Sequence, residues 1–229
     1  MKNWLIFLVS SVVLAHSSYV EIGSMKELKS FVDAETLVIF DLDNTVFHAK
    51  RYDCHASWCY DQVEAEKKIG SLSLERGMQI YLQWAESQKS CPVEFVEAET
   101  ALEIEQLQKR NIKIMALTSR GVDLENETLE QLRSLGLSFA SSALSRDFLE
   151  FSVKTKAKFV EGILFVSMQN SKGSSLKKYF DLVNYQPKKI VFIDDLMENL
   201  ESLEASFRDI NFIGLHYPLV SNNCFPEGF

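Results

Sequence analysis

Four consecutive apolar residues, 37–40, predict a short buried strand, and two carboxylates, Asp41 and Asp43, follow where that strand should end. Side chains two residues apart on an extended chain leave from the same side, so the two acids repel each other. A divalent cation, or a partner kept protonated, would remove this conflict. The segment therefore predicts a charged site at the carboxyl end of a buried strand.

Predicted strands and helices alternate along most of the chain. The apolar patterns favour strands at 36–40, 112–117, 148–153, 159–167, 189–193 and 210–216, and helices at 25–32, 61–70, 72–89, 95–109, 124–135, 174–182 and 196–207. This alternation predicts an α/β fold, with a mostly parallel sheet covered by helices on both faces. In such sheets, ligands bind beyond the carboxyl ends of the strands.

Three further polar fragments follow strand-like or apolar segments, namely Thr118-Ser119-Arg120, Lys172-Gly173 and Asp194-Asp195. Each fragment alone has an ordinary explanation, such as a turn that caps a helix or acids that favour a helix N-terminus through its dipole. The Asp41–Asp43 pair alone could bind calcium or solvate a loop. The occurrence of all four fragments in this order, near predicted strand ends, favours a single metal-assisted site for phosphoryl transfer.

At these residues the chain resembles the haloacid dehalogenase (HAD) superfamily. Asp41-Leu42-Asp43-Asn44-Thr45 is similar to the first motif of that superfamily, Thr118 to the second, Lys172 to the third and Asp194-Asp195 to the fourth. The resemblance covers about residues 25–217 and implies a Rossmann-like HAD fold. Within the superfamily the chain is most similar to the DUF2608 group of exported bacterial proteins, through the fragments 116–120, 162–165 with 172–173, and 192–195.

The resemblance assigns catalytic roles to the first motif. It implies that Asp41 is a nucleophile that forms an aspartyl-phosphate, and that Asp43 protonates the leaving alkoxide and later deprotonates the attacking water. Mg²⁺ is the implied cofactor, with the carboxylates of Asp41 and Asp194 and the backbone carbonyl of Asp43 as its protein ligands. Thr45 is a lesser candidate, whose hydroxyl would fix the loop.

The remaining motifs would bind the phosphoryl group and orient the site. The resemblance implies that Thr118 and the backbone amide of Ser119 donate hydrogen bonds to phosphoryl oxygens, and that Lys172 neutralises charge on the nucleophile and on the transferring group. Asp195 would orient metal-bound water or the lysine. For Arg120, two interpretations stay open: it lines the pocket, or it forms a salt bridge at a helix start.

Together these features predict a Mg²⁺-dependent phosphomonoesterase that acts on a small phosphorylated metabolite. The acid/base Asp43 favours phosphoryl transfer over dehalogenation, and the chain lacks the DKTGT sequence of ion-pumping ATPases. A phosphomutase needs the same motifs, but export disfavours it. The alternative from another class is a non-catalytic HAD-fold protein, such as a secreted interaction protein, which a missing nucleophile or acid/base would favour.

Residues 46–95 separate the first motif from the rest of the predicted sheet. We therefore expect a core of 18–45 and 96–229, and a small, mainly helical cap at 46–95, where the superfamily places a cap over the active site. This insertion carries four large aromatic residues of interest: Trp58, Tyr60, Tyr81 and Trp84. For Trp58 and Tyr60, core packing and substrate contact both stay open, as does pocket lining for His48 and Arg51.

The N-terminal residues 1–17 are typical of a secretory signal peptide. Lys2 precedes the apolar stretch 4–15, and Ala15-His16-Ser17 offers small residues for cleavage. The apolar stretch is short for a membrane-spanning helix, although an uncleaved anchor or a buried helix stays open. We expect a periplasmic or secreted protein with no stable membrane insertion after cleavage. Its net charge of −8, without a basic cluster, disfavours nucleic acid as a partner.

The four cysteines are Cys54, Cys59, Cys91 and Cys224. An even number in an oxidising compartment predicts one or two disulfides, and three complete pairings are possible. A bridge between Cys54 and Cys59, or between either of them and Cys91, would staple the insertion. A zinc site built from Cys54, His55 and Cys59, with His48, is a sharper alternative, and free buried thiols are a third.

Overall fold

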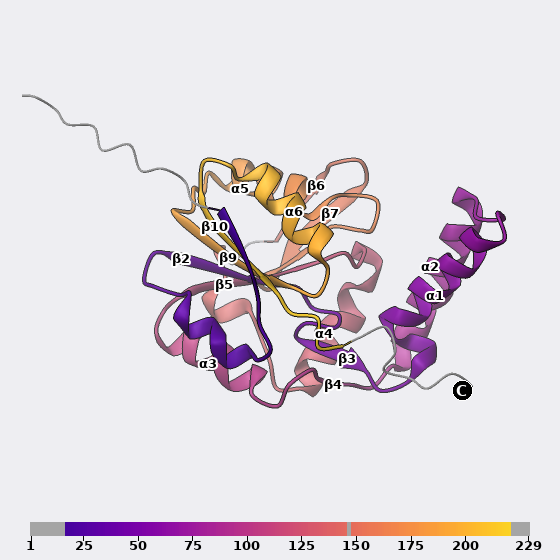
Figure 1. Cartoon of the computed structure of the whole chain (residues 1–229), viewed down its shortest axis with the longest axis horizontal. Coiled ribbons are helices and arrows are strands. Elements are labelled where there is room, and N and C mark those ends of the chain that lie inside the picture. The colour runs from indigo at the N-terminus through magenta and orange to yellow at the C-terminus, as the bar shows by residue number, and fades with distance from the viewer. Residues whose placement is uncertain (1–16, 146–147, 221–229) are drawn as a thin grey trace, which may run out of the picture.

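The computed structural model describes residues 17–145 and 148–220. In this part of the chain eight strands form one sheet in the order β1-β10-β9-β2-β5-β8-β7-β6 (Figure 1). From the first edge these are β1 (Ser17–Glu21), β10 (Asn211–His216), β9 (Lys189–Asp194), β2 (Thr36–Phe40), β5 (Lys113–Thr118), β8 (Ile163–Phe165), β7 (Lys156–Val160) and β6 (Leu149–Ser152). The pairs from β1 to β8 are parallel, and β7 and β6 are added antiparallel.

Helices cover both faces of the sheet, as the alternation predicts. Figure 1 shows α5 (Lys172–Val183) and α6 (Met197–Ser206) on one side, and α3 (Thr100–Lys109) and α4 (Glu125–Ser134) on the other. The central strand β2 is buried at all five positions because it lies between these layers. Its alternate residues serve different layers: Val38 and Phe40 pack with α3 and α4, whereas Leu37 and Ile39 pack with α5 and α6.

Several predicted elements differ from those observed. The predicted strand 159–167 is two antiparallel strands, β7 and β8, because Glu161 and Gly162 both adopt positive φ and reverse the chain. The predicted helix 95–109 begins only at Thr100, because Val93–Phe95 forms strand β4. Strand β1 was not predicted. The predicted helix 25–32 is a short 3₁₀ helix, Met25–Ser30.

Residues 46–95 form a separate substructure between β2 and α3. A two-stranded antiparallel ribbon, β3 (Phe47–Ala49) with β4 (Val93–Phe95), forms its base, and α1 (Ala56–Lys68) and α2 (Leu74–Ser87) project from it (Figure 1). We call α1 and α2 the helical hairpin. Its inner faces pack around Cys59, Ile80 and Trp84 together with Leu124 of the core, so the base of the hairpin is fixed to the sheet-forming part of the chain.

A disulfide joins Cys54 and Cys91 across a sequence separation of 37 residues. It links the start of the helical hairpin to the segment that follows it. Cys59 is a free buried thiol, and burial raises the pKa of this thiol to about 11. The zinc-site interpretation is therefore wrong, because the sulfur of Cys54 is already bonded. Cys224 lies outside the described residues.

The predicted leader, 1–17, lies outside the described residues apart from Ser17, which begins β1. Strand β1 pairs in parallel with β10 from Ser17 to Glu21 and forms one edge of the sheet. Within residues 17–145 and 148–220, no helix has both the length and the apolar character needed to cross a bilayer.

Candidate active site

The carboxyl ends of three adjacent strands bring the predicted motifs together. Asp41 follows β2, Thr118 ends β5 and Asp194 ends β9, and β2 lies between the other two in the sheet. All three side chains are buried. The backbone N–H of Asp41 donates to the carbonyl of Ile193 at 2.9 Å, which extends the β2–β9 ladder into the site. The parallel register therefore aligns acids that are far apart in the sequence.

Lys172 reaches the same point from the first turn of α5. Its Nζ lies 2.5 Å from Oδ1 of Asp41 and 2.7 Å from Oδ2 of Asp194. Lys172 is the first residue of α5, which begins two residues before the helix predicted at 174–182. The adjacent Gly173 explains the close fit, because a Cβ there would lie 2.0 Å from the carbonyl oxygen of Ser202 in α6. A glycine at this position lets α5 begin directly against α6 and places Lys172 over the acids.

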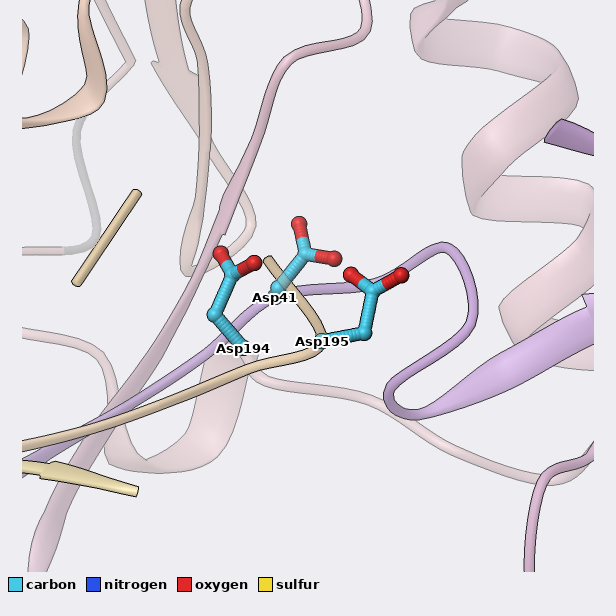
Figure 2. Close-up of side chains that lie close together, drawn as sticks. All are labelled: Asp41, Asp194 and Asp195. Carbon is cyan, nitrogen blue, oxygen red and sulfur yellow. The ribbon is translucent and has the colours of Figure 1, made fainter. Parts of the chain in front are cut away.

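The two acids that contact this ammonium group belong to a set of three neighbouring carboxylates. Asp41, Asp194 and Asp195, which we call the carboxylate cluster, offer oxygens that all lie within 4.8 Å of one another (Figure 2). Burial raises the pKa of Asp41 to about 7; Lys172 opposes this shift and Asp194 adds to it. Burial, with repulsion from Asp41 and Asp194, raises the pKa of Asp195 to about 8. One ammonium group cannot offset two buried carboxylates and a half-buried one, so the cluster favours extra positive charge.

The electrostatic state of Lys172 agrees with this surplus of negative charge. Burial alone would lower the pKa of the ammonium group, but attraction to Asp194 and Asp41 more than compensates and raises the pKa above its ordinary value. Lys172 therefore remains a cation. Asp194 is fixed on its other side, where Oδ1 accepts hydrogen bonds from the Leu196 N–H and the Asn199 side chain, both at 2.9 Å.

The donor set of the carboxylate cluster fits Mg²⁺. Every ligand atom that it offers is a carboxylate oxygen, the type that hard divalent cations prefer. Asn44, held with a φ of 62° in the loop after β2, donates to Asp195 at 3.4 Å. Its amide oxygen Oδ1 is buried and has no hydrogen-bond partner among the described residues. An unpaired buried acceptor beside surplus carboxylate charge is consistent with a site for a hydrated cation.

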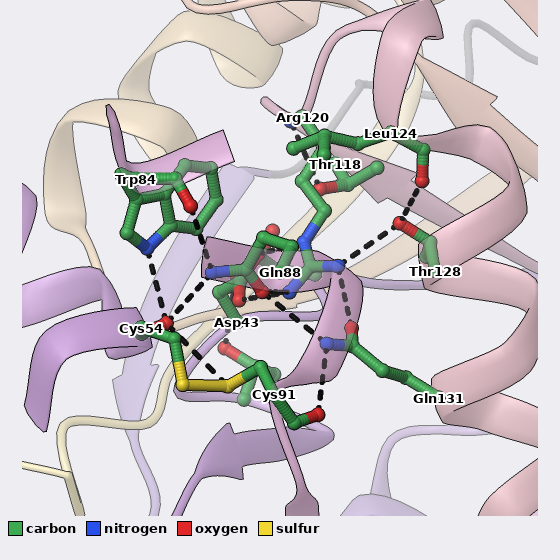
Figure 3. A network of polar contacts seen from close by, with 12 residues as sticks. Asp43, Cys54, Trp84, Gln88, Cys91, Thr118, Arg120, Leu124, Thr128 and Gln131 are labelled. Carbon is green, nitrogen blue, oxygen red and sulfur yellow. Dashed lines mark hydrogen bonds and ion pairs between the residues drawn. A yellow bond between two sulfur atoms is a disulfide. The ribbon is translucent and has the colours of Figure 1, made fainter. Parts of the chain in front are cut away.

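The side chain of Asp43 lies apart from this cluster. Both of its oxygens accept hydrogen bonds from Arg120, at 2.7 Å from Nε and 2.8 Å from Nη2 (Figure 3). Of the two interpretations of Arg120, the salt bridge is present, and the same side chain also lines the cleft. The identity of its partner could not be read from the sequence, because the two residues are 77 positions apart.

A cleft of about 420 Å³ opens over the acids. Its walls include Asp41, Asp43, Thr118, Ser119, Lys172 and Asp195 from the core, and Tyr60 and Trp84 from the helical hairpin. Burial, together with the nearby Asp195 and Asp41, raises the pKa of Tyr60 well above its ordinary value. Trp58 packs in the hairpin core instead, and neither His48 nor Arg51 lines the cleft. The two aromatic residues at the cleft, Tyr60 and Trp84, are therefore the ones placed to meet a ligand.

Comparisons with known proteins agree with this architecture. Residues 21–225 match the family described as "Protein of unknown function (DUF2608)". A protein of Chlamydia trachomatis serovar D is 25% identical over 221 residues, which is 93% of this chain and 83% of that protein. A protein of Chlamydia pneumoniae is 28% identical over 206 residues, 87% of this chain and 77% of that protein. The name of each begins "Putative outer membrane protein".

One similar solved structure comes from Burkholderia xenovorans LB400 and is titled a "putative haloacid dehalogenase-like hydrolase". The two structures have a TM-score of 0.50 and 11% sequence identity, and the match covers 85% of this chain and 89% of that chain. At this identity the similarity concerns the fold alone. The mostly parallel sheet, with helices on both faces, is thus a HAD-like fold. Because the family match spans most of the sequence, the chain belongs to the DUF2608 family.

Proposed function

We propose that this chain is a Mg²⁺-dependent phosphomonoesterase in which Asp41 is the nucleophile. The observation that carries the proposal is the buried carboxylate cluster with Lys172 at the base of a cleft that also contains Thr118. A Mg²⁺ ion at the carboxylate cluster would place two positively charged groups, the ion itself and Lys172, beside the hydroxyl of Thr118, and such a site would bind an anionic ester. The cleft volume of about 420 Å³ suits a small phosphorylated molecule.

The contacts of Asp41 distinguish its two oxygens. Oδ1 is bound by Lys172, whereas Oδ2, within the described part of the chain, has only a long 3.4 Å contact with the hydroxyl of Thr45. Oδ2 is therefore the oxygen with electron pairs free to attack phosphorus and form the aspartyl-phosphate. Mg²⁺ bound by the carboxylate cluster would neutralise the repulsion between this carboxylate and the incoming ester.

Thr118 and Ser119 are proposed to hold the phosphoryl oxygens. The hydroxyl oxygen of Thr118 accepts the N–H of Arg120 at 3.1 Å, so its own proton remains available to a ligand. Lys172 would stabilise charge as it develops on the transferring group. Asp195, beside Asp41 at the mouth of the cluster, would ligate the cation directly or orient its waters.

Asp43 is proposed to move a proton in both halves of the reaction. It would protonate the leaving alkoxide as the aspartyl-phosphate forms, and then deprotonate the water that hydrolyses it. Asp43 lines the same cleft as Asp41, which supports this role. Its backbone carbonyl is the proposed third protein ligand of the cation, beside the carboxylates of Asp41 and Asp194.

We further propose that residues 46–95 form a cap over the core of 18–45 and 96–229, and that the mature protein is periplasmic or secreted. The helical hairpin contributes Tyr60 and Trp84 to the cleft, as expected of a cap that selects the leaving group. A disulfide between Cys54 and Cys91 suits an oxidising compartment. The predicted leader and the names of the Chlamydia proteins are consistent with export.

A panel of phosphate esters, assayed on the purified mature protein with Mg²⁺ and with a chelator, tests the proposal. We expect metal-dependent phosphate release that Asp41→Asn abolishes and Asp43→Asn severely reduces. Asp181→Asn is the matched control, because this exposed carboxylate pairs only with Lys177 on the surface of α5. Full activity in Asp41→Asn would exclude the nucleophile, and no turnover of any ester would favour a non-catalytic binding protein.

A further inference from the structure

Arg120 holds the proposed acid/base and is itself held on every side. Its side chain is only 2% exposed. Besides the two bonds to Asp43, Nη1 donates to Thr128 at 3.0 Å and to Gln131 at 2.7 Å, and Nη2 donates to Gln88 at 3.2 Å. These contacts provide an acceptor for each of the five N–H donors of a guanidinium group. The position of Arg120 is therefore fully specified by its neighbours.

The partners of Arg120 come from both parts of the molecule. Thr128 and Gln131 belong to α4 of the core, whereas Gln88 follows α2 in the insertion. The guanidinium carbon also lies 5.2 Å from the ring centre of Phe47 and 5.6 Å from that of Trp84, both in the insertion. The network thus spans the boundary between insertion and core at the edge of the cleft.

The backbone carbonyls of the two disulfide-bonded cysteines accept hydrogen bonds from this network (Figure 3). The carbonyl of Cys54 accepts the side-chain N–H groups of Gln88 at 2.8 Å and of Trp84 at 3.1 Å. The carbonyl of Cys91 accepts Nε2 of Gln131 at 3.4 Å. Gln88, Trp84 and Gln131, which all contact Arg120, therefore donate hydrogen bonds to the two residues that the disulfide joins.

We propose that Arg120 is a positioning residue for Asp43, and that the Cys54–Cys91 disulfide maintains this position, so that full activity requires the oxidised protein. The inference rests on the proposed phosphomonoesterase function. It assigns the disulfide a role in the acid/base step in addition to any effect on stability.

The hydrogen bonds explain why position matters for this carboxylate. Both oxygens of Asp43 face N–H donors of Arg120, so a proton on either oxygen would meet a donor rather than an acceptor. Asp43 must therefore turn away from Arg120 to carry a proton, and return when it is ionised. A fixed Arg120 guanidinium group defines the position to which the ionised Asp43 carboxylate returns. A loosened guanidinium would let the carboxylate sample unproductive positions.

Reduction breaks the anchor in a defined way. A dithiol reductant supplies two electrons and two protons, the S–S bond is replaced by two thiols, and the reductant becomes a disulfide. The carbonyls of Cys54 and Cys91 are then no longer held together, and the contacts of Gln88, Trp84 and Gln131 loosen. The expected consequence is a lower kcat with little change in KM, because Thr118 contacts the backbone N–H of Arg120 and not its guanidinium group.

The test compares two substrates, 4-nitrophenyl phosphate and glycerol 2-phosphate. An alkoxide leaving group needs a proton, whereas nitrophenolate leaves readily without one. We expect Arg120→Met to lower kcat on the alkyl ester by about 10²-fold, within the usual range for acid/base groups, and to lower it much less on the aryl ester. Arg120→Lys should recover part of the loss. Arg133→Met is the matched control, because Arg133 is exposed and pairs with Glu161 on the surface.

The disulfide is tested with the Cys54→Ser/Cys91→Ser double variant and with reduced wild type. Both should show the same preferential loss on the alkyl ester, and dithiothreitol should not change the double variant further. In an Asp43→Asn background, removal of the disulfide should cause no additional loss, because its effect acts through Asp43. Circular dichroism and a thermal melt identify variants that fail to fold.

The outcomes separate this inference from the function on which it rests. An inactive oxidised wild type would refute the phosphomonoesterase itself. An active wild type whose kcat survives both reduction and Arg120→Met would overturn only the positioning role. Equal losses on both esters, or losses that persist in the Asp43→Asn background, would show that the network is merely structural and would also overturn it.

Discussion

At the residue scale, the site is defined by unbalanced charge. Lys172 contacts two acids, and Asp195 brings a third carboxylate close to them. Buried like charges are retained only where a counter-charge or a proton compensates them. The raised pKa values of Asp41, about 7, and of Asp195, about 8, indicate that protons take this place when no cation does. Protons and Mg²⁺ should therefore compete for the same oxygens.

This competition predicts how Mg²⁺ stabilisation depends on pH. In the metal-free protein the folded-state pKa values of Asp41 and Asp195 lie above their unfolded values, so stability from these groups is lost as pH rises from about 4 through about 8. A cation replaces the departing protons. The rise in Tm on adding Mg²⁺ should thus be larger at pH 8.5 than at pH 5.5, a range set by these pKa values.

Thermal melts with and without Mg²⁺, at both pH values, check this expectation. Asp195→Asn provides the comparison, because removing one carboxylate from the cluster should reduce both the Mg²⁺ effect and its pH dependence. A Mg²⁺ shift that is equal at the two pH values, or larger in acid, would contradict competition at the carboxylate cluster.

At the element scale, helix α5, which carries Lys172, is positioned by a close approach to α6. Gly173 lies where a methyl group would collide with the backbone of Ser202, at a Cβ–O separation of 2.0 Å. Gly173 also donates its N–H to the hydroxyl of Ser202 at 3.0 Å. The contact fixes the start of α5 and therefore Lys172, the preceding residue. Packing between two helices thus sets the geometry of a charged group.

Gly173→Ala should therefore damage both stability and activity. Because the clash is with the backbone of Ser202, α5 must shift, and overpacking of this kind destabilises a fold by about 1–3 kcal/mol. We expect a lower free energy of unfolding in urea and a lower kcat. Gly23→Ala is the control, since a Cβ there would have only an ordinary contact at 3.9 Å. Wild-type stability in Gly173→Ala would show that the helices are free to separate.

The sequence predicts part of this arrangement and misses the rest for identifiable reasons. Acids and a threonine directly after apolar runs predict Asp41, Thr118 and Asp194 at adjoining strand ends, because parallel strands share an edge. The turn at Glu161 and Gly162 interrupts the apolar residues on either side by only two positions, so two strands were predicted as one. The Arg120–Asp43 pair joins residues 77 positions apart, and no local pattern reports such a contact.

At the scale of the whole molecule, strand β1 forms one edge of the sheet and begins where the predicted leader ends. Five residues from Ser17, the last residue of the predicted leader, to Glu21 pair with β10. Cleavage well beyond Ser17 would remove hydrogen bonds along this edge. The position of the cleavage site and the boundary of the fold should therefore coincide.

We predict that the mature protein begins near Ser17. Mass spectrometry of N-terminal peptides from the native protein measures this directly. A mature chain that still begins at Met1 would contradict the signal peptide, and one that begins beyond Glu21 would contradict the role of β1 in the folded protein.

The central claim is that Asp41 carries the phosphoryl group, and trapping that group tests it most directly. In Asp43→Asn, 4-nitrophenyl phosphate should still phosphorylate Asp41, because its leaving group needs little protonation, while hydrolysis lacks its base. Rapid quenching followed by peptide mass spectrometry should then find one phosphoryl group on Asp41, removable by hydroxylamine and absent in Asp41→Asn. An unmodified Asp41 during turnover, or a phosphoryl group on another residue, would contradict the account.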